Sequence, residues 1–291
     1  MSSVNELAQW VGPVVLFLLM TAVGLELVPD DFRRLRKSPG AVVGGTAAQL
    51  IGLPLLTWGV VVLLDLPPIF GAGAVLVAVA PGAGISNVFV AAAGANTALS
   101  VTLTAFASAL AAFSLPTFAS LGLEVFMGES VDVDVPVLQL IAQLFFTLLV
   151  PLGLGMFLRA RWPEFVARRG RLLQASALIV IVGLTALGVA YGESDGLDFD
   201  DAQAGVLGAA VWTLAAMALG WTVAWLLGLE SRDRFTFLIE FSTRNIGVAG
   251  IVALAGLARV DLALFMGAYV VTGYPIAAGA VLLRRIWWAN T

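Results

Sequence analysis

Three polar side chains interrupt an apolar stretch near the C-terminal end of the chain. The segment from Phe237 to Gly256 reads FLIEFSTRNIGVAGIVALAG and contains Glu240, Arg244 and Asn245. A lone charge at the centre of a bilayer costs about 2.5–3.5 kcal/mol, so charged residues in such segments indicate an ion or substrate site. The alternative is structural, because Glu240 and Arg244 are four residues apart on a helix and could pair with each other.

A second interruption lies in the apolar segment 69–93. The stretch APGAGISNVF contains a proline, two glycines and a polar pair, namely Pro81, Gly82, Gly84, Ser86 and Asn87. A single proline in a membrane helix usually serves packing, whereas irregular backbone at membrane depth is tolerated only where it is buried in protein or lines a wet cavity. Interruptions at corresponding positions of two halves are typical of transporters built from inverted repeats, with the site between the breaks.

The elements that must position these residues are membrane helices. Of the 291 residues, 60% are hydrophobic and 12% are charged, which is too apolar for a soluble domain. Apolar runs close to the ~20 residues that a membrane helix needs predict an all-α polytopic protein with nine transmembrane helices. These lie at about 7–28, 40–64, 69–93, 97–121, 136–158, 172–192, 203–228, 234–256 and 261–284.

The basic residues predict how the helices cross the membrane. Of the 15 Lys and Arg residues, all except Arg244 and Arg259 fall in loops that nine spans place on one side. The positive-inside rule makes that side cytoplasmic, with the N-terminus outside and the C-terminus inside. The first apolar run follows Glu6 and no basic residue, so we expect a membrane helix there rather than a cleavable signal peptide.

The absence of certain residue types limits the chemistry. The chain has no cysteine and no histidine, which excludes disulfides, thiolate metal sites, histidine proton relays and haem ligation by either residue. No Ser/His or Asp/Asp arrangement suggests catalysis, so we do not expect an enzyme. We also expect no nucleic-acid partner.

The interrupted segments and their surroundings resemble the bile acid:sodium symporter family. The resemblance covers nearly the whole chain and includes GLELVPDDFRRLRKSPG, AAQLIGLPLL, APGAGISNVFVAAAGANTALSVTLTAF and IEFSTRNIG. The family's third segment reads approximately PGG-x-x-SN, a short gap, then LS-x-x-x-T. Here it is matched by Pro81, Gly82, Ser86, Asn87, Leu99, Ser100 and Thr104.

The resemblance implies a fold of two inverted five-helix repeats that form a core and a panel. This chain is similar to a shortened form without the family's first helix, which leaves a 4+5 arrangement. By that mapping, residues 1–291 form one membrane transporter domain. Its core covers about 40–121 and 203–284, and its panel covers about 7–28 and 136–192.

The resemblance also implies a sodium site. It assigns the ligands Ser86, Asn87, Ser100, Thr104 and Glu240. Sodium is a hard cation that prefers oxygen ligands, and Ser100 and Thr104 place two hydroxyls on one helical face. The alternative for these two hydroxyls is a hydrogen bond to the carbonyl four residues earlier in their own helix.

A second sodium site of the family is altered in this chain. Gln49 and Thr243 lie at matching positions, but the family's Gln-Asn pair is replaced by Arg244-Asn245. A guanidinium is always charged, so we expect Arg244 to replace the second ion and to leave one sodium ion as the only cofactor. Two alternatives are that Arg244 binds an anionic substrate, or that it pairs with Glu240.

These residues together predict a secondary active transporter in the cytoplasmic (plasma) membrane. It would import a small organic anion with sodium, either bile-acid-like or a small carboxylate of the pantoate or pyruvate type. We expect the substrate to contact Gly84, Ile85, Ser86, Arg244 and Asn245, because the helix start after the first break presents free amides to a carboxylate. Lipid is the other partner, and we expect a monomer.

Three alternatives remain at this point. The first is a sodium-independent carrier or an exporter of the same fold, as in the related arsenite and auxin carriers, although the missing cysteine disfavours thiolate binding of arsenite. The second is an intramembrane enzyme or sensor. The third is a channel, which is disfavoured because the polar residues gather at two breaks instead of lining several helices.

Overall fold

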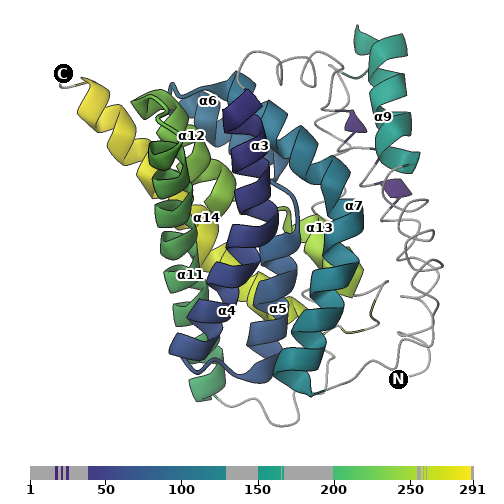
Figure 1. The fold of residues 1–291 in the computed structure, drawn as a ribbon, viewed down its shortest axis with the longest axis vertical. Helices are drawn as coiled ribbons and strands as arrows, with labels where there is room; N and C mark the ends of the chain where they lie inside the picture. The colour runs from purple at the N-terminus through teal and green to yellow at the C-terminus, as the bar shows by residue number, and fades with distance from the viewer. Residues whose placement is uncertain are drawn as a thin grey trace.

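The computed structural model describes residues 39–128, 150–164, 199–253 and 261–289, together with the single residues 17, 18, 21, 24, 25, 166, 257 and 259. Every regular element within these ranges is a helix (Figure 1). The elements are α3 (Pro39–Ala47), the π-helical turn η2 (Ala48–Gly52), α4 (Leu53–Leu63), α5 (Pro68–Val79), α6 (Gly84–Ala92), α7 (Thr97–Met127), α9 (Val150–Arg161), α11 (Phe199–Leu226), α12 (Ser231–Ser242), α13 (Ile246–Ile251) and α14 (Ala263–Ala289).

Three of the described helical segments are long and apolar enough to cross a membrane. They are Pro39–Leu63, Asp201–Leu226 and Ala263–Ile286. The predicted panel spans 7–28 and 172–192 and most of 136–158 lie outside the described residues or include only isolated ones. The all-helical class is therefore confirmed for the described part, while the count of nine helices stays a prediction.

The helices differ from their predicted ranges for local reasons. The predicted span 97–121 continues to Met127, because nothing breaks the helix before Gly128, whose φ of 62° ends it in the left-handed conformation. The predicted span 40–64 contains the turn η2, which the sequence did not indicate. Such π-helical turns are rare and often occur at functional positions.

Both predicted interruptions are present. The helix α5 ends at Val79, and Ala80, the residue before Pro81, is extended with ψ of 147°, as expected for a residue that precedes proline. The helix α12 ends at Ser242, and Thr243 is extended although no proline or glycine precedes it. The sequence therefore contains a local cause for the first break only.

The two breaks contact each other. The Asn245 amide donates to the Pro81 carbonyl at 2.9 Å, and the Ala83 amide donates to the Thr243 carbonyl at 3.1 Å, which makes a short antiparallel bridge between Gly82 and Arg244. Unpaired backbone groups are costly at membrane depth. Each break therefore supplies hydrogen-bond partners to the other.

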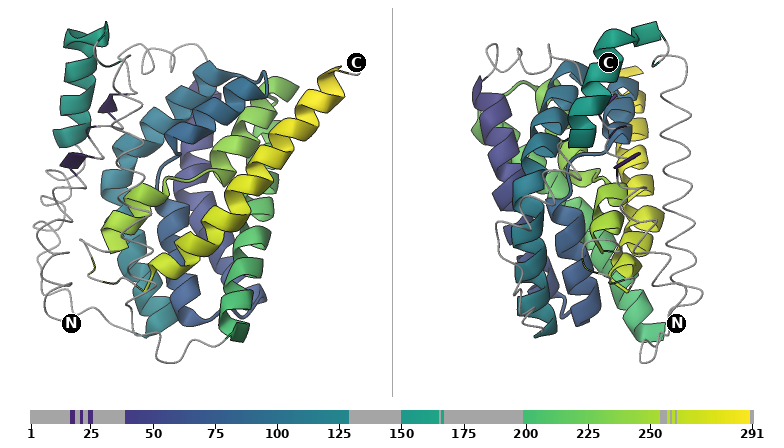
Figure 2. Two further views of the ribbon diagram at one scale, coloured as in Figure 1. Left: turned by 180° about the vertical axis from the view of Figure 1, so that it is seen from behind. Right: turned by 90° about the vertical axis from the view of Figure 1, so that its right-hand side faces the viewer.

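The helix α5 is the centre of the packed body. Every residue from Phe70 to Val79 is buried, and α5 packs against α4, α7 and α14. The helix α11 packs against α12 and α14, and α14 crosses the body diagonally in the rear view (Figure 2, left). One apolar core joins the helices of both sequence halves, so the two breaks are held inside a single body.

Candidate functional site

A buried carboxylate lies where the two breaks meet. Glu240 belongs to the last turn of α12, and its side chain is fully buried. The Ser86 hydroxyl of α6 donates to its Oε1 at 2.5 Å, and the Thr104 hydroxyl of α7 donates to its Oε2 at 2.9 Å. The Ser100 hydroxyl of α7 also donates to Oε1. Three helices thus converge on one carboxylate.

The hydroxyls of α7 do not bond to their own helix at this site. Ser100 and Thr104 donate to Glu240. The neighbouring Thr102 instead donates to the Ala98 carbonyl at 2.8 Å, which is the bond to the carbonyl four residues earlier that Ser and Thr often form in membrane helices. The self-bonding alternative for Ser100 and Thr104 is therefore not what the structure shows.

Oxygen atoms outnumber protons in this cluster. The single Ser86 proton lies within reach of both Glu240 Oε1 and the Ala83 carbonyl at 2.7 Å. The single Ser100 proton is likewise shared between Glu240 Oε1 and Asn87 Oδ1, the latter at 2.7 Å. Each hydroxyl can donate only once, so acceptor lone pairs are left over. A small hard cation would satisfy them.

Gly82 gives the carboxylate its space. A Cβ atom at this position would lie 2.7 Å from Glu240 Oε2 and 3.0 Å from Thr104 Oγ1. Gly82 is therefore required for close approach of the first break to the cluster.

Arg244 lies beside the cluster and is also fully buried. Its Nη1 donates to Gln49 Oε1 at 2.8 Å and to the Glu240 backbone carbonyl at 3.2 Å. Its Nη2 donates to the carbonyls of Ala78, at 3.3 Å, and Ala80. The guanidinium thus contacts the backbone of Glu240 and not its carboxylate, so the simple pairing of the two side chains is not the arrangement found here.

The turn η2 places Gln49 against Arg244. Gln49 is fully buried in η2, and its Oε1 accepts from the guanidinium. Four polar atoms of this region have no hydrogen-bond partner within the described residues: Thr46 Oγ1, Gln49 Nε2, Thr243 Oγ1 and Arg244 Nε. Of the predicted second sodium site, Gln49 and Arg244 therefore contact each other, and Thr243 directly precedes Arg244 in the second break.

The predicted substrate contacts lie at the starts of the two half-helices. No side chain caps the N-terminus of α6, which begins at Gly84, and Ile85 is 39% exposed beside the buried Ser86. Asn245 is half-buried and uses its Oδ1 to cap α13 by accepting from the Val248 amide at 3.2 Å. Its side-chain nitrogen has no hydrogen-bond partner within the described residues.

Two tyrosines of α14 belong to the site but were not predicted. The Tyr269 hydroxyl accepts from the Arg244 amide at 2.8 Å and donates to the Ser242 carbonyl at 2.5 Å. The Tyr274 hydroxyl donates to the Arg244 carbonyl at 3.0 Å. They therefore satisfy the backbone groups that the second break frees. Nothing in the stretch GAYVVTGYP distinguishes such tyrosines from ordinary packing residues.

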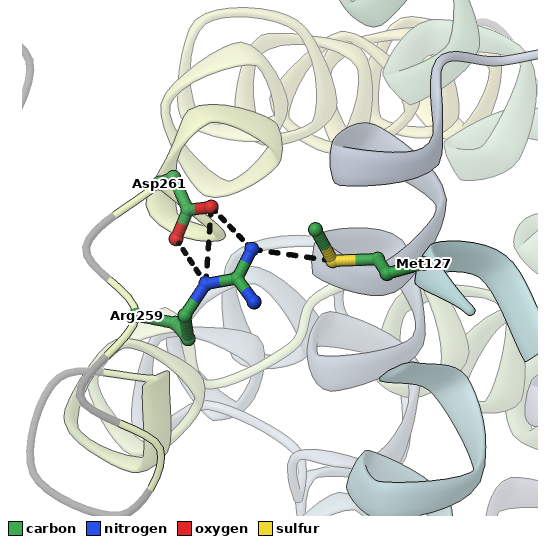
Figure 3. Close-up of polar contacts among 3 residues, drawn as sticks. All are labelled: Met127, Arg259 and Asp261. Atoms are coloured by element: carbon green, nitrogen blue, oxygen red, sulfur yellow. Dashed lines mark hydrogen bonds and ion pairs between the residues drawn. The ribbon is translucent and has the colours of Figure 1, made fainter. Parts of the chain in front are cut away.

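A polar contact at the other end of α7 involves Arg259, the basic residue predicted in an outer loop. Arg259 forms a bidentate salt bridge with Asp261, with Nε···Oδ1 and Nη2···Oδ2 distances of 3.0 and 2.6 Å (Figure 3). Its Nη2 also contacts the Met127 sulfur at 3.4 Å. The charge of Arg259 is therefore balanced locally by Asp261.

The fold and the site define the class of the protein. Two interrupted helices that meet break to break around a buried carboxylate, inside an apolar helical body, are typical of a secondary membrane transporter. The chain belongs to the sodium bile acid symporter family, whose model matches residues 13–194. That match includes the residues from Gln49 to Thr104 of the site and ends before Glu240.

Individual relatives are similar over more of the chain. The uncharacterized sodium-dependent transporter YocS of Bacillus subtilis is 29% identical over 261 residues, which cover 87% of this chain and 77% of that protein. The probable sodium/metabolite cotransporter BASS1 (chloroplastic) of Arabidopsis thaliana is 27% identical over 84% of this chain. The corresponding BASS2 of Oryza sativa subsp. japonica is 30% identical over 82% of this chain. The alignments span 59% and 55% of the two plant proteins.

Proposed function

We propose that the protein is a symporter that moves one sodium ion with a small organic anion by alternating access. The observation that carries this proposal is the Glu240 cluster. The buried carboxylate accepts from three hydroxyls, one of which also contacts the Asn87 amide oxygen, and the hydroxyl protons are too few for the acceptors around them. A monovalent hard cation such as sodium does not need several carboxylate ligands, and one carboxylate together with neutral oxygen ligands suits it. Ser86, Asn87, Ser100, Thr104 and Glu240 would hold the ion.

We further propose that Arg244 replaces a second sodium ion. Its guanidinium donates to carbonyls at the end of α5, and carbonyls freed at helix breaks are the groups that coordinate sodium in transporters of this kind. Full burial and four acceptors on its terminal nitrogens favour this role over direct contact with a substrate. Gln49 and Thr243 would then be what remains of the second ion site.

For the substrate, we propose a small carboxylate bound between the half-helix starts. The uncapped N-terminus of α6 offers amides and the positive end of the helix dipole, which favour an anion. Asn245 lies at the start of the opposite half-helix, where its side-chain nitrogen has no partner within the described residues, and Ile85 is an exposed apolar side chain of α6. Gly84 and Ser86, the first and third residues of α6, complete the proposed contacts.

The whole-chain arrangement is part of the same proposal. Nine membrane helices in a 4+5 repeat would cross the plasma membrane with the N-terminus outside, the core at about 40–121 and 203–284, and the panel at about 7–28 and 136–192. Burial of both breaks in one body formed by the two sequence halves supports the assignment of the core. The names of the relatives are those of transporters, which supports a carrier over an enzyme.

The test is a thermal-shift experiment on purified protein with sodium, potassium or choline chloride, each with pyruvate or pantoate. A ligand that binds the native state stabilises it, by about 2.7 kcal/mol at a hundred times its dissociation constant. We expect a shift with sodium that the carboxylate increases and that Glu240→Gln abolishes. Glu124→Gln, which changes an exposed carboxylate, is the control. Carboxylate binding of equal strength in all three salts would instead indicate the sodium-independent carrier.

A further inference from the structure

The fixed charges buried in the described body sum to zero. Of the charged side chains whose burial the structure describes, Glu240 and Arg244 are buried and the others are at least partly exposed. One is an anion and the other a permanent cation. Both lie at the break-to-break contact, where the proposed substrates bind.

The positive charge cannot leave this position by a simple rotamer change. The two terminal nitrogens of Arg244 donate to Gln49 and to three backbone carbonyls, and its backbone amide and carbonyl are held by Tyr269 and Tyr274. The guanidinium therefore behaves as part of the framework. It is carried through the transport cycle whether or not sodium is bound.

We infer that transport by this protein is electroneutral, with one sodium ion accompanying one monovalent anion, so that the membrane potential does not drive uptake. This inference rests on the proposed function and concerns the charge that the same site carries. It also specifies the substrate class as monocarboxylates.

The reason is the charge of each loading state. The empty site carries Glu240 and Arg244 and has no net charge. The site with both sodium and a monovalent anion is again neutral, whereas sodium alone leaves one positive charge and the anion alone leaves one negative charge. A net charge is disfavoured in a low-dielectric interior. Only the empty and the fully loaded protein should therefore change readily between the outward-open and inward-open conformations. This restriction couples the transport of sodium to that of the anion.

The net charge of the loaded site also distinguishes between possible substrates. A dicarboxylate bound with one sodium would leave one net negative charge on the moving site. Without Arg244, the empty site itself would carry that charge. We therefore expect pyruvate or pantoate to be transported and succinate to be a poor substrate.

The experiment uses the full-length protein in liposomes, with ²²Na⁺ as tracer and external pyruvate, pantoate or succinate. A potassium gradient with valinomycin sets the potential at zero or about −100 mV, inside negative. We expect sodium-dependent initial rates with pyruvate or pantoate that are equal at the two potentials. If one uncompensated charge moved in each cycle, the initial rates would differ between the two potentials, and the accumulation of ²²Na⁺ followed to steady state would change on the order of 50-fold per 100 mV. Either outcome would overturn the inference.

Two variants test the role of Arg244. Arg244→Gln removes the fixed cation, so either a second ion or a negatively charged empty site should make the rate depend on potential. Arg244→Lys keeps the charge while losing most of the hydrogen bonds, and it should stay insensitive. If Arg244→Gln folds and is also insensitive, the fixed charge is not the cause and the inference is wrong. If Arg244→Gln misfolds, the inference is tested by the ratio of the uptake rates at the two potentials, measured for the wild-type protein and for Arg244→Lys.

The outcomes separate this inference from the proposed function. Absence of sodium-stimulated uptake with every carboxylate, in protein that is folded, contradicts the proposed function and this inference with it. Sodium-stimulated uptake that accelerates with the potential contradicts only the inference.

Discussion

Glu240 supplies the negative charge of the proposed sodium site. Replacing it by the nearly isosteric Gln removes that charge while keeping a carbonyl oxygen near Ser86 and Thr104, so we expect Glu240→Gln to lose sodium-dependent stabilisation and sodium-coupled uptake. Ser100→Ala with Thr104→Ala removes two neutral ligands. At ~1 kcal/mol for each lost contact, this double variant should raise the half-maximal sodium concentration roughly 10- to 100-fold.

Sodium titrations of thermal stability and of uptake measure both changes. The order of the effects is the critical result, because a formal charge should matter more to a cation than two dipoles. A folded Glu240→Gln protein with an unchanged sodium response would exclude the assignment.

Gly82 provides a second prediction at this scale. In Gly82→Ala the added methyl would press on the carboxylate of Glu240 and on Thr104, because its Cβ would lie 2.7 Å from Glu240 Oε2. Overpacking of this kind costs about 1–3 kcal/mol. We expect weaker sodium binding in titration and a lower thermal midpoint. Gly59→Ala is the matched control, since nothing lies within 4 Å of a Cβ at that exposed position on α4. Equal effects of the two substitutions would refute the close-approach role.

The residues of the site were predictable to different degrees. Glu240, Arg244 and Asn245 are conspicuous in an apolar segment, and Ser86, Ser100 and Thr104 follow from the family motif. Tyr269 was missed, because a tyrosine in a membrane helix has several ordinary roles. Its function here depends on which carbonyl its hydroxyl reaches, and a single sequence does not contain that information.

At the scale of elements, the two breaks have different causes. Pro81 and its neighbouring glycines interrupt the first helix locally. The second break contains no such residue and is stabilised from outside, by Tyr269, Tyr274 and the backbone of the first break. Sequence reasoning therefore identified the cause of the first break and only the polar residues of the second. The turn η2 went unpredicted because no residue type marks a π-helical turn.

The turn between α6 and α7 is the element that sets the register of the site. Asn96 caps α7 by accepting from the Leu99 amide, its side-chain nitrogen donates to Asp233 at 2.8 Å, and its backbone amide donates to the Thr236 hydroxyl at 3.0 Å. Asn96 lies one turn before Ser100, and Thr236 lies one turn before Glu240. This contact therefore fixes α7 against α12 beside the carboxylate cluster.

A charge swap tests that contact. Asn96→Asp keeps the helix cap but places two carboxylates together, so we expect a loss of about 1–3 kcal/mol and weaker sodium binding. Adding Asp233→Asn restores one donor opposite one acceptor and should recover most of both quantities. Thermal unfolding and sodium titration of the two single variants and the double variant form a double-mutant cycle. If the double variant is no better than the sum of the single ones, the contact does not position the site.

At the scale of the whole molecule, the two ends of α7 carry different charge arrangements. Near its start, Arg232 of α12 and Arg284 of α14 donate to carbonyls of the turn at Ala93–Ala95. Near its end, Arg259 is matched by Asp261 (Figure 3). The helix has 31 residues, so these ends are roughly 46 Å apart at 1.5 Å per residue. Arg232 and Arg284 thus lie at the end of α7 that the positive-inside rule assigns to the cytoplasm.

The orientation can be tested on the full chain because it has no cysteine, which makes every introduced one unique. We expect a membrane-impermeant maleimide to label Glu129→Cys and Asp198→Cys on intact cells, and to label Arg36→Cys, Arg169→Cys and Arg285→Cys only after permeabilisation. The reason is that the last three replace basic residues of the loops predicted to be cytoplasmic, whereas the first two lie in acidic loops. The cysteine-free parent sets the background. Suppose that Arg169→Cys is labelled on intact cells and Asp198→Cys is protected, while Glu129→Cys is labelled as expected. The prediction of a single span between Glu129 and Arg169 would then be wrong. Reversal at all five positions would keep the nine helices and invert the molecule.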